Sequence, residues 1–423
     1  TTPRLANWPS KRPTRVLKFP ELLTVWERPA WGVSRRGQAA ARLPSVKIAI
    51  VLDDSLARPD GVQEYVRTIS RAMGERGHEV HVLCSGDAGE PPAGVTAVHS
   101  LTSNVGVTFN GNGLRTPRPA KRSVLRRHLA EQRYDVLHVQ TPHSPFFAAR
   151  VVREARRVQG DSVRIVATFH ILPDGRVSEW GTRILGQGLR RNLRLFDGFA
   201  AVSAPAVEFA KWAFGVDATV ISNAVRVDEL RAHALAHPWP ADPHGRVVIA
   251  FLGRLVERKG AVELIEAFAA LPAELRAGLV LRLGGRGPLK ERIESLVERH
   301  QLTDSVALEG FVADDDKPGF LAGADIAVFP ATGGESFGIV LTEAMASGSG
   351  VVLGGDNPGY TWTLGDSRAI VDPRDTRAFA ERLTMMATDP LACESLHAQQ
   401  QDRVRDFDVT AVADRLESLY RGA

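Results

Sequence analysis

The feature that most constrains the fold of this chain is a strand–helix–strand pattern that occurs early and then begins again in the second half. The first copy opens with SVKIAIVLDD, in which Val46, Ile48, Ile50 and Val51 form the apolar body of a buried strand. GVQEYVRTISRAMGERGHEV follows with the apolar spacing of an amphipathic helix, which Gly77 suits as a C-terminal cap, and EVHVLCSG is the next strand. Two parallel strands joined by a helix form a right-handed βαβ unit, so we expect a parallel sheet.

Further strands are expected at DVLHVQ, RIVATFH and GFAAVS, and the pattern restarts at RVVIAFLGRL after a loose, proline-containing stretch. The helix AVELIEAFAALPAEL and the strands LVLRLGGRG, VALEGFV, IAVFPA and GVVLGG complete the second copy. The predicted fold class is therefore α/β, with two doubly wound, Rossmann-like domains and a ligand-binding cleft between them. The predicted division is an extension at 1–45, domains at 46–222 and 246–404, a linker at 223–245, and a C-terminal helix at 405–423 that packs back on the first domain.

Length and composition exclude several protein classes. The 423 residues suit two domains of roughly 200 residues each, and 44% hydrophobic with 24% charged residues is ordinary globular composition. No apolar run approaches the ~18 residues that span a bilayer, and we expect no signal peptide. The two cysteines, Cys84 and Cys393, are too few for a disulfide framework or a cysteine-based zinc site. An integral membrane protein, a disulfide-stapled secreted domain and a disordered chain are thus excluded.

Charge is distributed unevenly along the chain. Residues 1–200 carry 31 Lys and Arg against 17 Asp and Glu, whereas residues 201–423 carry 22 against 32. This asymmetry indicates that the first half meets an anionic partner such as an acidic membrane surface, a phosphorylated acceptor or nucleic acid. The basic extension at 1–45 also contains Trp8, Trp26 and Trp31. We expect it to pack loosely on the body, although basic residues with tryptophan also suit a membrane interface.

The motif that points most directly to chemistry is GGESFGIVLTEAMASG at residues 333–348. No dinucleotide fingerprint, P-loop, Cys/His metal cluster or nucleophile elbow accompanies it, which disfavours hydride transfer and Walker-type phosphoryl transfer. We expect the two glycines to form a turn and a helix to begin at about Ser336, with its free N–H groups favouring a diphosphate. Glu335 and Glu343 would then lie about 12 Å apart, at opposite ends of a nucleotide sugar.

This string resembles the Glu-x7-Glu region of retaining family 4 glycosyltransferases with the GT-B fold, and is most similar to the phosphatidylinositol mannosyltransferases that use GDP-mannose. The resemblance covers about residues 46–423 and extends to FLGRLVERKG, GFVADDDK, ATFH and PDGVQEYV. It implies a donor site on the C-terminal domain and an acceptor site on the N-terminal domain. The implied donor-binding residues are Gly61, Arg254, Lys259, Val312, Asp314, Lys317, Glu335, Ser336, Phe337, Gly338, Ile339, Val340 and Glu343.

The resemblance also implies roles in the reaction for four residues: Arg254 and Lys259 neutralise the leaving diphosphate, Glu335 orients the sugar, and His170 holds sugar hydroxyls or stabilises the transition state. Gln63 and His170 are the implied acceptor-binding residues. The sequence departs from the family pattern at Asp60, which precedes Gly61 where a second glycine is usual, and in QTPHSP, ISNAV and FDV. These departures concern the acceptor side more than the donor side.

A second basic segment, PRPAKRSVLRRHLAEQR, predicts an amphipathic helix with Val124, Leu125 and Leu129 on one side. Lys121, Arg122, Arg126 and Arg127 would lie against an anionic membrane, as a basic helix does in the related enzymes, whereas a solvated helix is the alternative.

The resemblance therefore implies an α-mannosyltransferase that moves mannose from GDP-mannose to phosphatidylinositol, with no metal or other cofactor required. We expect it to lie in the cytoplasm, peripherally on the inner face of the plasma membrane, and to bind no nucleic acid. The alternatives are the same chemistry on a soluble acceptor, such as an inositol phosphate or a glycan, and a non-catalytic protein that binds sugar nucleotides.

Overall fold

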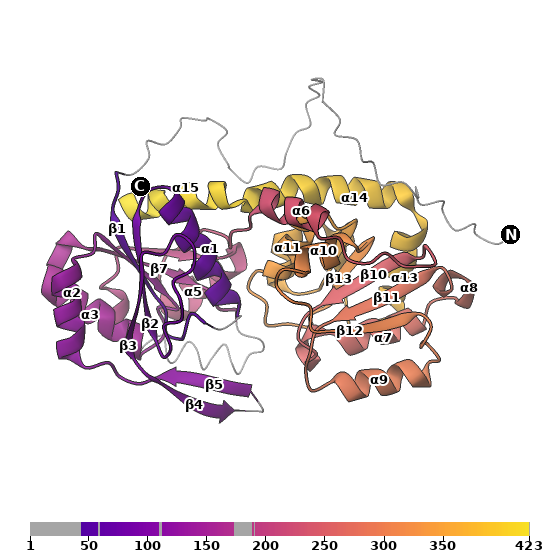
Figure 1. Ribbon diagram of the computed structural model, residues 1–423, viewed down its shortest axis with the longest axis horizontal. Coiled ribbons are helices and arrows are strands. Elements are labelled where there is room, and N and C mark those ends of the chain that lie inside the picture. The colour runs from indigo at the N-terminus through magenta and orange to yellow at the C-terminus, as the bar shows by residue number, and fades with distance from the viewer. Residues whose placement is uncertain (1–43, 58–59, 110–111, 173–187, 190, 423) are drawn as a thin grey trace, which may run out of the picture.

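The computed structural model describes residues 44–57, 60–109, 112–172, 188–189 and 191–422. These residues form two parallel sheets that lie side by side, each covered by helices (Figure 1). The prediction of two doubly wound α/β domains is confirmed. Of the extension expected at 1–45, residues 1–43 lie outside the described residues.

The N-terminal sheet has seven parallel strands in the order β3-β2-β1-β6-β7-β8-β9. Their bounds are β1 Lys47–Val51, β2 Glu79–Ser85, β3 Ala97–Thr102, β6 Val136–Gln140, β7 Arg164–Phe169, β8 Gly198–Ala201 and β9 Thr219–Val220. The small antiparallel hairpin of β4 Asn104–Phe109 and β5 Asn112–Pro117 extends from this domain. The strand order changes direction between β1 and β6, so their carboxyl ends border a natural ligand site.

The C-terminal sheet has six parallel strands in the order β12-β11-β10-β13-β14-β15. Their bounds are β10 Val247–Leu252, β11 Leu279–Gly284, β12 Val306–Gly310, β13 Ile326–Phe329, β14 Val351–Gly355 and β15 Ile370–Val371. Every residue of β6 and of β11 is buried, because helices cover both faces of the two sheets. This burial explains why the strands appear in the sequence as nearly continuous apolar runs.

The helices form where the apolar spacing predicts them, with some differences in extent. Their bounds in the N-terminal half are α1 Gly61–Glu75, α2 Arg122–Gln132, α3 Phe147–Gln159, the 3-10 turn η1 Gly160–Ser162, α5 Ala204–Phe214 and α6 Val227–Ala236. In the C-terminal half they are η2 Glu257–Lys259, α7 Ala261–Ala269, α8 Ala273–Arg276, α9 Lys290–Arg299, α10 Lys317–Ala322, α11 Ile339–Ser347, α12 Pro358–Leu364, η3 Ser367–Ala369, α13 Thr376–Thr388, α14 Pro390–Arg403, η4 Val404–Phe407 and α15 Val409–Arg421. The stretch expected as a loose linker thus contains a helix, α6.

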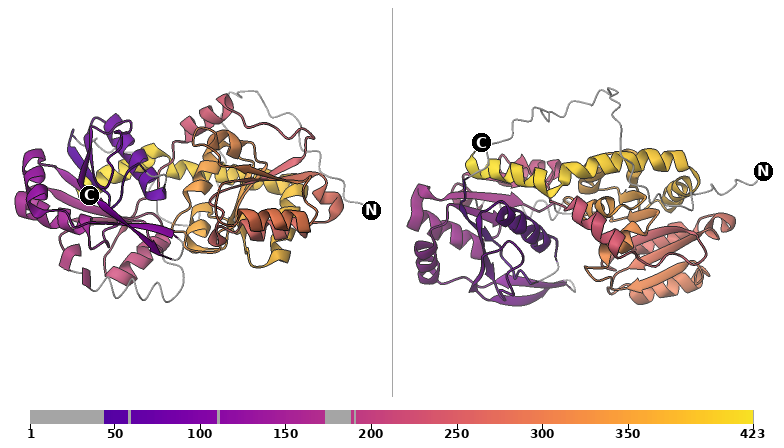
Figure 2. Two further views of the ribbon diagram at one scale, coloured as in Figure 1. Left: turned by 60° about the horizontal axis from the view of Figure 1, so that its bottom comes forward. Right: turned by 45° about the horizontal axis from the view of Figure 1, so that its top comes forward.

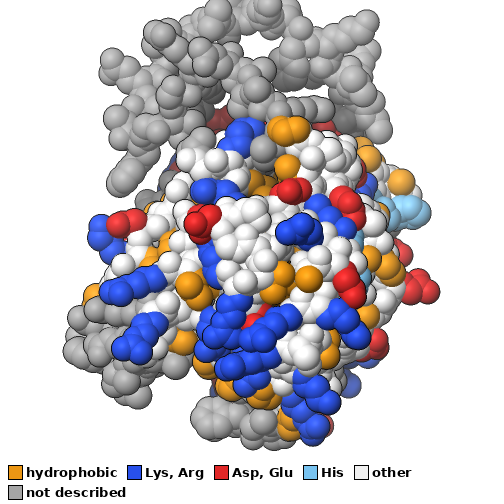
Figure 3. All heavy atoms as spheres, turned by 90° about the vertical axis from the view of Figure 1, so that its left-hand side faces the viewer, with side chains coloured by type: hydrophobic (Ala, Val, Ile, Leu, Met, Phe, Trp, Pro, Cys, Tyr) orange, Lys and Arg blue, Asp and Glu red, His pale blue; other side chains and the backbone are white. Residues whose placement is uncertain are grey.

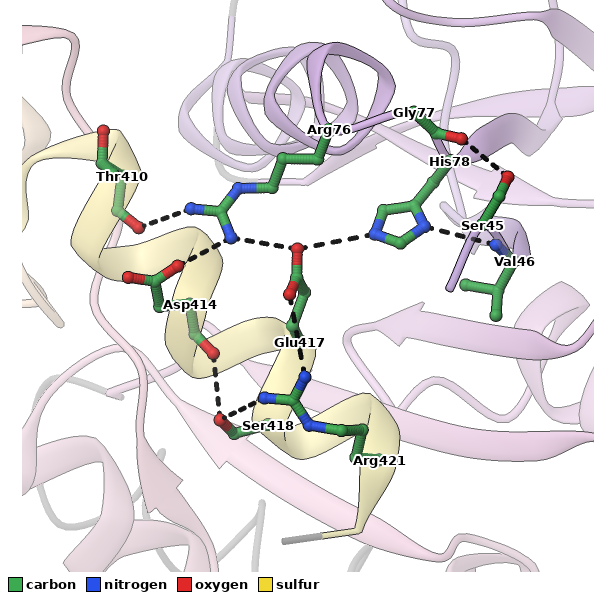
Figure 4. A network of polar contacts seen from close by, with 10 residues as sticks. All are labelled: Ser45, Val46, Arg76, Gly77, His78, Thr410, Asp414, Glu417, Ser418 and Arg421. Carbon is green, nitrogen blue, oxygen red and sulfur yellow. Dashed lines mark hydrogen bonds and ion pairs between the residues drawn. The ribbon is translucent and has the colours of Figure 1, made fainter. Parts of the chain in front are cut away.

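The last helices cross from one domain to the other, as the yellow segment in Figures 1 and 2 shows. α14 lies on the C-terminal domain, whereas Leu416 and Tyr420 of α15 belong to the same buried core as Ile48 and Val66 of the N-terminal domain. A polar network reinforces this contact (Figure 4). The guanidinium of Arg76 donates to Glu417 at 2.9 Å and to the Thr410 carbonyl at 3.0 Å, and it lies 2.7 Å from Asp414.

Candidate active site

The carboxyl ends of the two sheets meet at residues that come from both domains. The Ser336 hydroxyl, in the loop before α11, donates to the backbone carbonyl of His170, which directly follows β7, at 2.9 Å. The Ser203 hydroxyl, which caps α5, donates to the Ser336 carbonyl at 2.5 Å. A Cβ added at Gly61, the first residue of α1, would lie 3.5 Å from the Ile339 side chain. The structure therefore brings four of the predicted site residues, Gly61, His170, Ser336 and Ile339, to one place between the domains.

A cationic loop follows β10 at this edge. The Lys259 ammonium lies 2.8 Å from Glu335 Oε1, and the guanidinium of Arg258 donates to the same oxygen at 2.5 Å. Arg254 is exposed, and the described part of the chain supplies it with no ion-pair partner. Arg254, Arg258 and Lys259 against Glu335 leave two net positive charges, which favours a doubly charged anion here. Arg258 is a member of this set that the sequence analysis missed, although it lies between the two predicted cations.

The loop that carries Glu335 is fixed by glycines and by a buried aromatic residue. Gly334 and Gly338 adopt φ values of +69° and +96°, and Phe337 is 1% exposed. The prediction that a helix begins at about Ser336 is wrong, because α11 begins at Ile339. The left-handed conformation of Gly338 cannot continue a right-handed helix, so the first turn starts only after it. Glu335 therefore lies in a loop, while Ile339 and Val340 supply the first N–H groups of α11.

A cavity of about 160 Å³ lies beside α11 and is lined by residues of both domains. Asp314, Lys317 and Glu343 line it from the C-terminal domain, and Glu64 of α1 lines it from the N-terminal domain. The Lys317 ammonium lies 2.7 Å from Asp314, and burial raises the pKa of Glu343, although Lys317 opposes this shift. Polar groups of both signs in a partly enclosed space suit hydroxyl groups and ring nitrogens of a nucleoside. The sequence analysis did not single out Glu64.

Two predicted donor residues do not present their side chains to this cavity. Val312 is 3% exposed and lies against the strand residue Gly284, where an added Cβ would approach its Cγ2 to 2.9 Å. Phe337 packs edge-on against Phe407, with ring centroids 5.2 Å apart. Both side chains stabilise the domain core, so only their backbone groups remain for a ligand.

His170 lies at the carboxyl end of β7 in a close packing environment. Its Nε2 is 2.8 Å from Gln140 Oε1, and the Tyr65 ring meets it edge-on at 4.8 Å between centroids. Burial, together with the nearby His138 and His143, lowers the pKa of His170 to about 3. The imidazole is therefore neutral near pH 7.

Gln63, which the resemblance places at the acceptor, is 4% exposed and donates to the Ser55 carbonyl at 3.4 Å. In this structure Gln63 braces the loop that follows β1.

The chain is similar to known proteins over most of its length. Residues 59–229 match the profile of Glycosyltransferase Family 4, and residues 238–403 match that of glycosyl transferases group 1. The phosphatidyl-myo-inositol mannosyltransferase of Mycobacterium leprae is 31% identical over 390 residues, which cover 89% of this chain and 96% of that protein. The chain belongs to glycosyltransferase family 4. The predicted membership and the predicted enzyme class are confirmed.

Other relatives and solved structures extend the comparison. The phosphatidyl-myo-inositol mannosyltransferase of Propionibacterium freudenreichii is 27% identical over 361 residues, covering 78% of this glycosyltransferase and 88% of that protein. Anabaena HepE in complex with UDP and glucose superposes with a TM-score of 0.67 at 18% identity, over 89% of this chain and 100% of that one. Sucrose-phosphate synthase of Thermosynechococcus elongatus gives 0.65 at 20% identity, over 89% and 98% of the two chains. These likenesses confirm the predicted GT-B fold.

The predicted basic helix of the glycosyltransferase, α2, has a buried apolar side and an exposed basic side. Leu125 and Leu129 of α2 are fully buried in the N-terminal core, so the apolar side of this helix faces inward. The exposed side is basic: Lys and Arg gather on the face that carries α2 and α3 (Figure 3). Lys121, Arg122, Arg126 and Arg127 are all exposed, and two of them pair with Glu154 of α3, Arg126 at 2.6 Å and Arg122 at 3.8 Å. Burial opposes ionisation of Glu154, but its arginine partners lower its pKa overall.

None of the helices in the described residues is long and apolar enough to cross a membrane. Within the same residues, no group of three or more His, Cys, Asp or Glu side chains is placed to hold a metal ion.

Proposed function

We propose that this glycosyltransferase moves mannose from GDP-mannose to the inositol ring of phosphatidylinositol, with retention of the anomeric configuration, at the inner face of the plasma membrane. The observation that carries the proposal is the likeness to phosphatidyl-myo-inositol mannosyltransferases over 96% of a relative's length. Three features of the site support it: a cationic loop paired with Glu335, the N-terminus of α11 that follows, and a polar cavity lined by both domains.

The donor fits these three features in order. The diphosphate lies against Arg254, Arg258 and Lys259 and receives the N–H groups at the start of α11, where the helix dipole favours negative charge. The nucleoside enters the cavity, in which Glu343 accepts from ribose hydroxyls and Asp314 and Lys317 lie near the base. Glu335 exchanges its ion pairs for a contact with the sugar once the diphosphate occupies the cations. The donor therefore binds mainly to the C-terminal domain.

The reaction breaks the bond between the sugar C1 and the diphosphate oxygen, and the acceptor oxygen forms its bond to C1 on the same face. The acceptor proton passes to the departing phosphate oxygen, so the leaving group acts as the base. The fixed cations and the α11 N-terminus stabilise the charge that develops on this group. His170 lies on the opposite side of the cleft, where a neutral imidazole contacts the sugar hydroxyls.

The basic face of the N-terminal domain is the proposed membrane surface. Its exposed members on α2 and just before it are Lys121, Arg122, Arg126 and Arg127. Each cation near an anionic surface contributes on the order of 1 kcal/mol, and the contribution decreases with salt. Because the apolar side of α2 is buried, the attraction is electrostatic and needs no insertion of this helix.

The experiment that tests the proposal is transfer of labelled mannose from GDP-mannose to phosphatidylinositol in anionic liposomes. We expect labelled lipid with the wild type and at most one-hundredth of that rate with Glu335→Gln. Lys290→Ala, which removes an exposed lysine of α9, serves as the control and should retain full activity. If product forms only with inositol phosphate or a glycan, the acceptor is that soluble compound and the lipid acceptor is wrong. If the protein binds the nucleotide but transfers sugar to no acceptor, the proposal of catalysis is refuted.

Liposome sedimentation tests the membrane surface separately. The double variant Arg122→Ala/Arg127→Ala should bind anionic liposomes about 30-fold more weakly than the wild type, because two cations that contribute about 1 kcal/mol each are lost. The matched control is Arg377→Ala, which removes an arginine that is 90% exposed on α13 of the other domain. Equal loss in both variants would contradict a specific role of α2.

A further inference from the structure

One face of the N-terminal sheet carries an unusual row of buried polar residues. His138 and Gln140 lie two residues apart on β6, and Thr168 and His170 lie two residues apart at the end of β7, so each pair shares one face. Gln140 is in register with Thr168. His138, Gln140 and Thr168 are all fully buried. Strands in the middle of a parallel sheet ordinarily carry apolar residues here, so these side chains require an explanation.

The hydrogen bonds divide the row into two pairs. His138 Nε2 lies 2.7 Å from the Thr168 hydroxyl, and its Nδ1 lies 2.9 Å from the Tyr420 hydroxyl of α15, so both ring nitrogens have partners. Gln140 Oε1 lies 2.8 Å from His170 Nε2. Gln140 Nε2 is buried and has no hydrogen-bond partner among the described residues. Gln140 thus makes one side-chain hydrogen bond in the described structure, and that bond is to the histidine of the site.

This contact favours one tautomer of the imidazole over the other. A neutral imidazole has one N–H donor and one acceptor nitrogen. A carbonyl oxygen facing Nε2 favours the tautomer with hydrogen on Nε2, which leaves the lone pair on Nδ1. The Tyr65 ring, whose centroid lies 4.8 Å from that of the imidazole, restricts rotation of the imidazole about its Cβ–Cγ bond.

We propose that Gln140 is a positioning residue that holds neutral His170 with its proton on Nε2, so that the Nδ1 lone pair faces the reacting sugar. The inference rests on the proposed function, because that function places His170 in the cleft in contact with the reacting sugar. A lone pair directed at developing positive charge on the sugar stabilises the transition state, whereas the other tautomer would present an N–H dipole of the wrong sign. Gln140 itself touches no substrate.

Two substitutions separate positioning from a structural role. Gln140→Met keeps the length of the side chain but removes the acceptor, and we expect kcat for mannosyl transfer to decrease by about 10²-fold with little change in KM. Gln140→Glu keeps an acceptor but adds a charge that raises the pKa of His170. Its activity should therefore be low in acid and recover toward the wild-type value as pH rises and the imidazole loses its extra proton. The other titratable groups facing His170 are His138, His143 and Tyr65, which both variants retain.

Tyr420→Phe is the matched control, because it removes one buried hydrogen bond at the other end of the same row. It should lower stability without changing the pH profile or kcat. If Gln140→Met also lowers stability alone and leaves kcat unchanged, the residue is structural and the proposal is wrong.

A readout without turnover keeps this proposal separate from the proposed function. In protein labelled with ¹⁵N-histidine, the His170 signals are identified by their loss in His170→Asn. We expect a protonated Nε2 and an unprotonated Nδ1 in the wild type, and a mixture of tautomers in Gln140→Met. A wild-type proton on Nδ1, or an unchanged tautomer in the variant, would overturn the proposal. A tautomer change in a protein that transfers no mannose would instead refute the function and leave the positioning role intact.

Discussion

The role of the loop before α11 can be tested with the two glycines that flank this helix, because both have the same backbone conformation but different surroundings. Gly338 precedes α11 with φ +96°, and Gly348 follows it with φ +93°. A Cβ at Gly338 would lie 2.5 Å from Tyr360 Cε1 and 2.9 Å from Leu341 Cδ1, whereas a Cβ at Gly348 would meet nothing within 4 Å. Both Gly338→Ala and Gly348→Ala therefore place an alanine in a strained backbone conformation. Only Gly338→Ala also creates a steric clash.

The expected magnitudes follow from these two contributions. An alanine in the left-handed region costs roughly 1–2 kcal/mol, which is the whole effect expected for Gly348→Ala. Overpacking a core costs about 1–3 kcal/mol more, and Tyr360 is 1% exposed, so its ring has no free space to enter. Gly338→Ala should thus lose about 2–5 kcal/mol in urea-induced unfolding.

The same pair separates folding from donor binding. Movement of the loop would displace Glu335 and the first N–H groups of α11, so we expect GDP to bind at least tenfold more weakly to Gly338→Ala. Gly348→Ala lies at the opposite end of the helix and should bind GDP as the wild type does. Equal losses of stability in the two variants, or unchanged GDP affinity in Gly338→Ala, would refute this account of the loop.

Two further predictions concern the N-terminal domain. Burial lowers the pKa of fully buried His138 to about 3, whereas an unfolded histidine titrates near 6.5. Because the unfolded state takes up the proton first, the stability from this residue is complete above pH 6.5 and is lost as pH falls toward 3, at about 1.4 kcal/mol per pH unit. His138→Gln should flatten the acid limb of a plot of unfolding free energy against pH by that amount, and an unchanged slope would contradict the assignment. Arg76→Met removes the guanidinium that holds the C-terminal helix (Figure 4) and should cost about 3 kcal/mol in chemical denaturation, because buried Glu417 loses an ion-pair partner that lies 2.9 Å away. Arg377→Met, at an exposed site, should change stability by less than about 0.5 kcal/mol, and a similar change in Arg76→Met would refute the role of the network.

The sequence was sufficient to predict elements in which the spacing of apolar residues alone indicates which side is buried. In α1, Val66, Ile69 and Met73 are buried at the helical spacing, and Gly77 adopts φ +89° just past its end. Glu335, Glu343, Lys259 and Lys317 come from motifs with fixed spacing. In the structure Lys259 pairs with Glu335, and Lys317 and Glu343 line one cavity.

Other features depend on partners that no local pattern specifies. The apolar spacing of α2 does not say whether Leu125 faces a membrane or α3, and the structure shows that it faces the core. The start of α11 was missed because Gly338 was interpreted as part of a helix, although its left-handed conformation ends the loop instead. Glu64 and Gln140 acquire their places from neighbouring elements, α10 and β7, that lie far from them in the sequence.

The measurement that tests the central claim most directly is a calorimetric titration of GDP into the wild type and Lys259→Ala. The interdomain site requires that a diphosphate bind to the cationic loop, so loss of one charge-assisted contact should weaken binding by about 10- to 100-fold. Lys290→Ala, as the matched control, should bind GDP like the wild type. Equal affinity in all three proteins, or binding of UDP alone, would contradict the account.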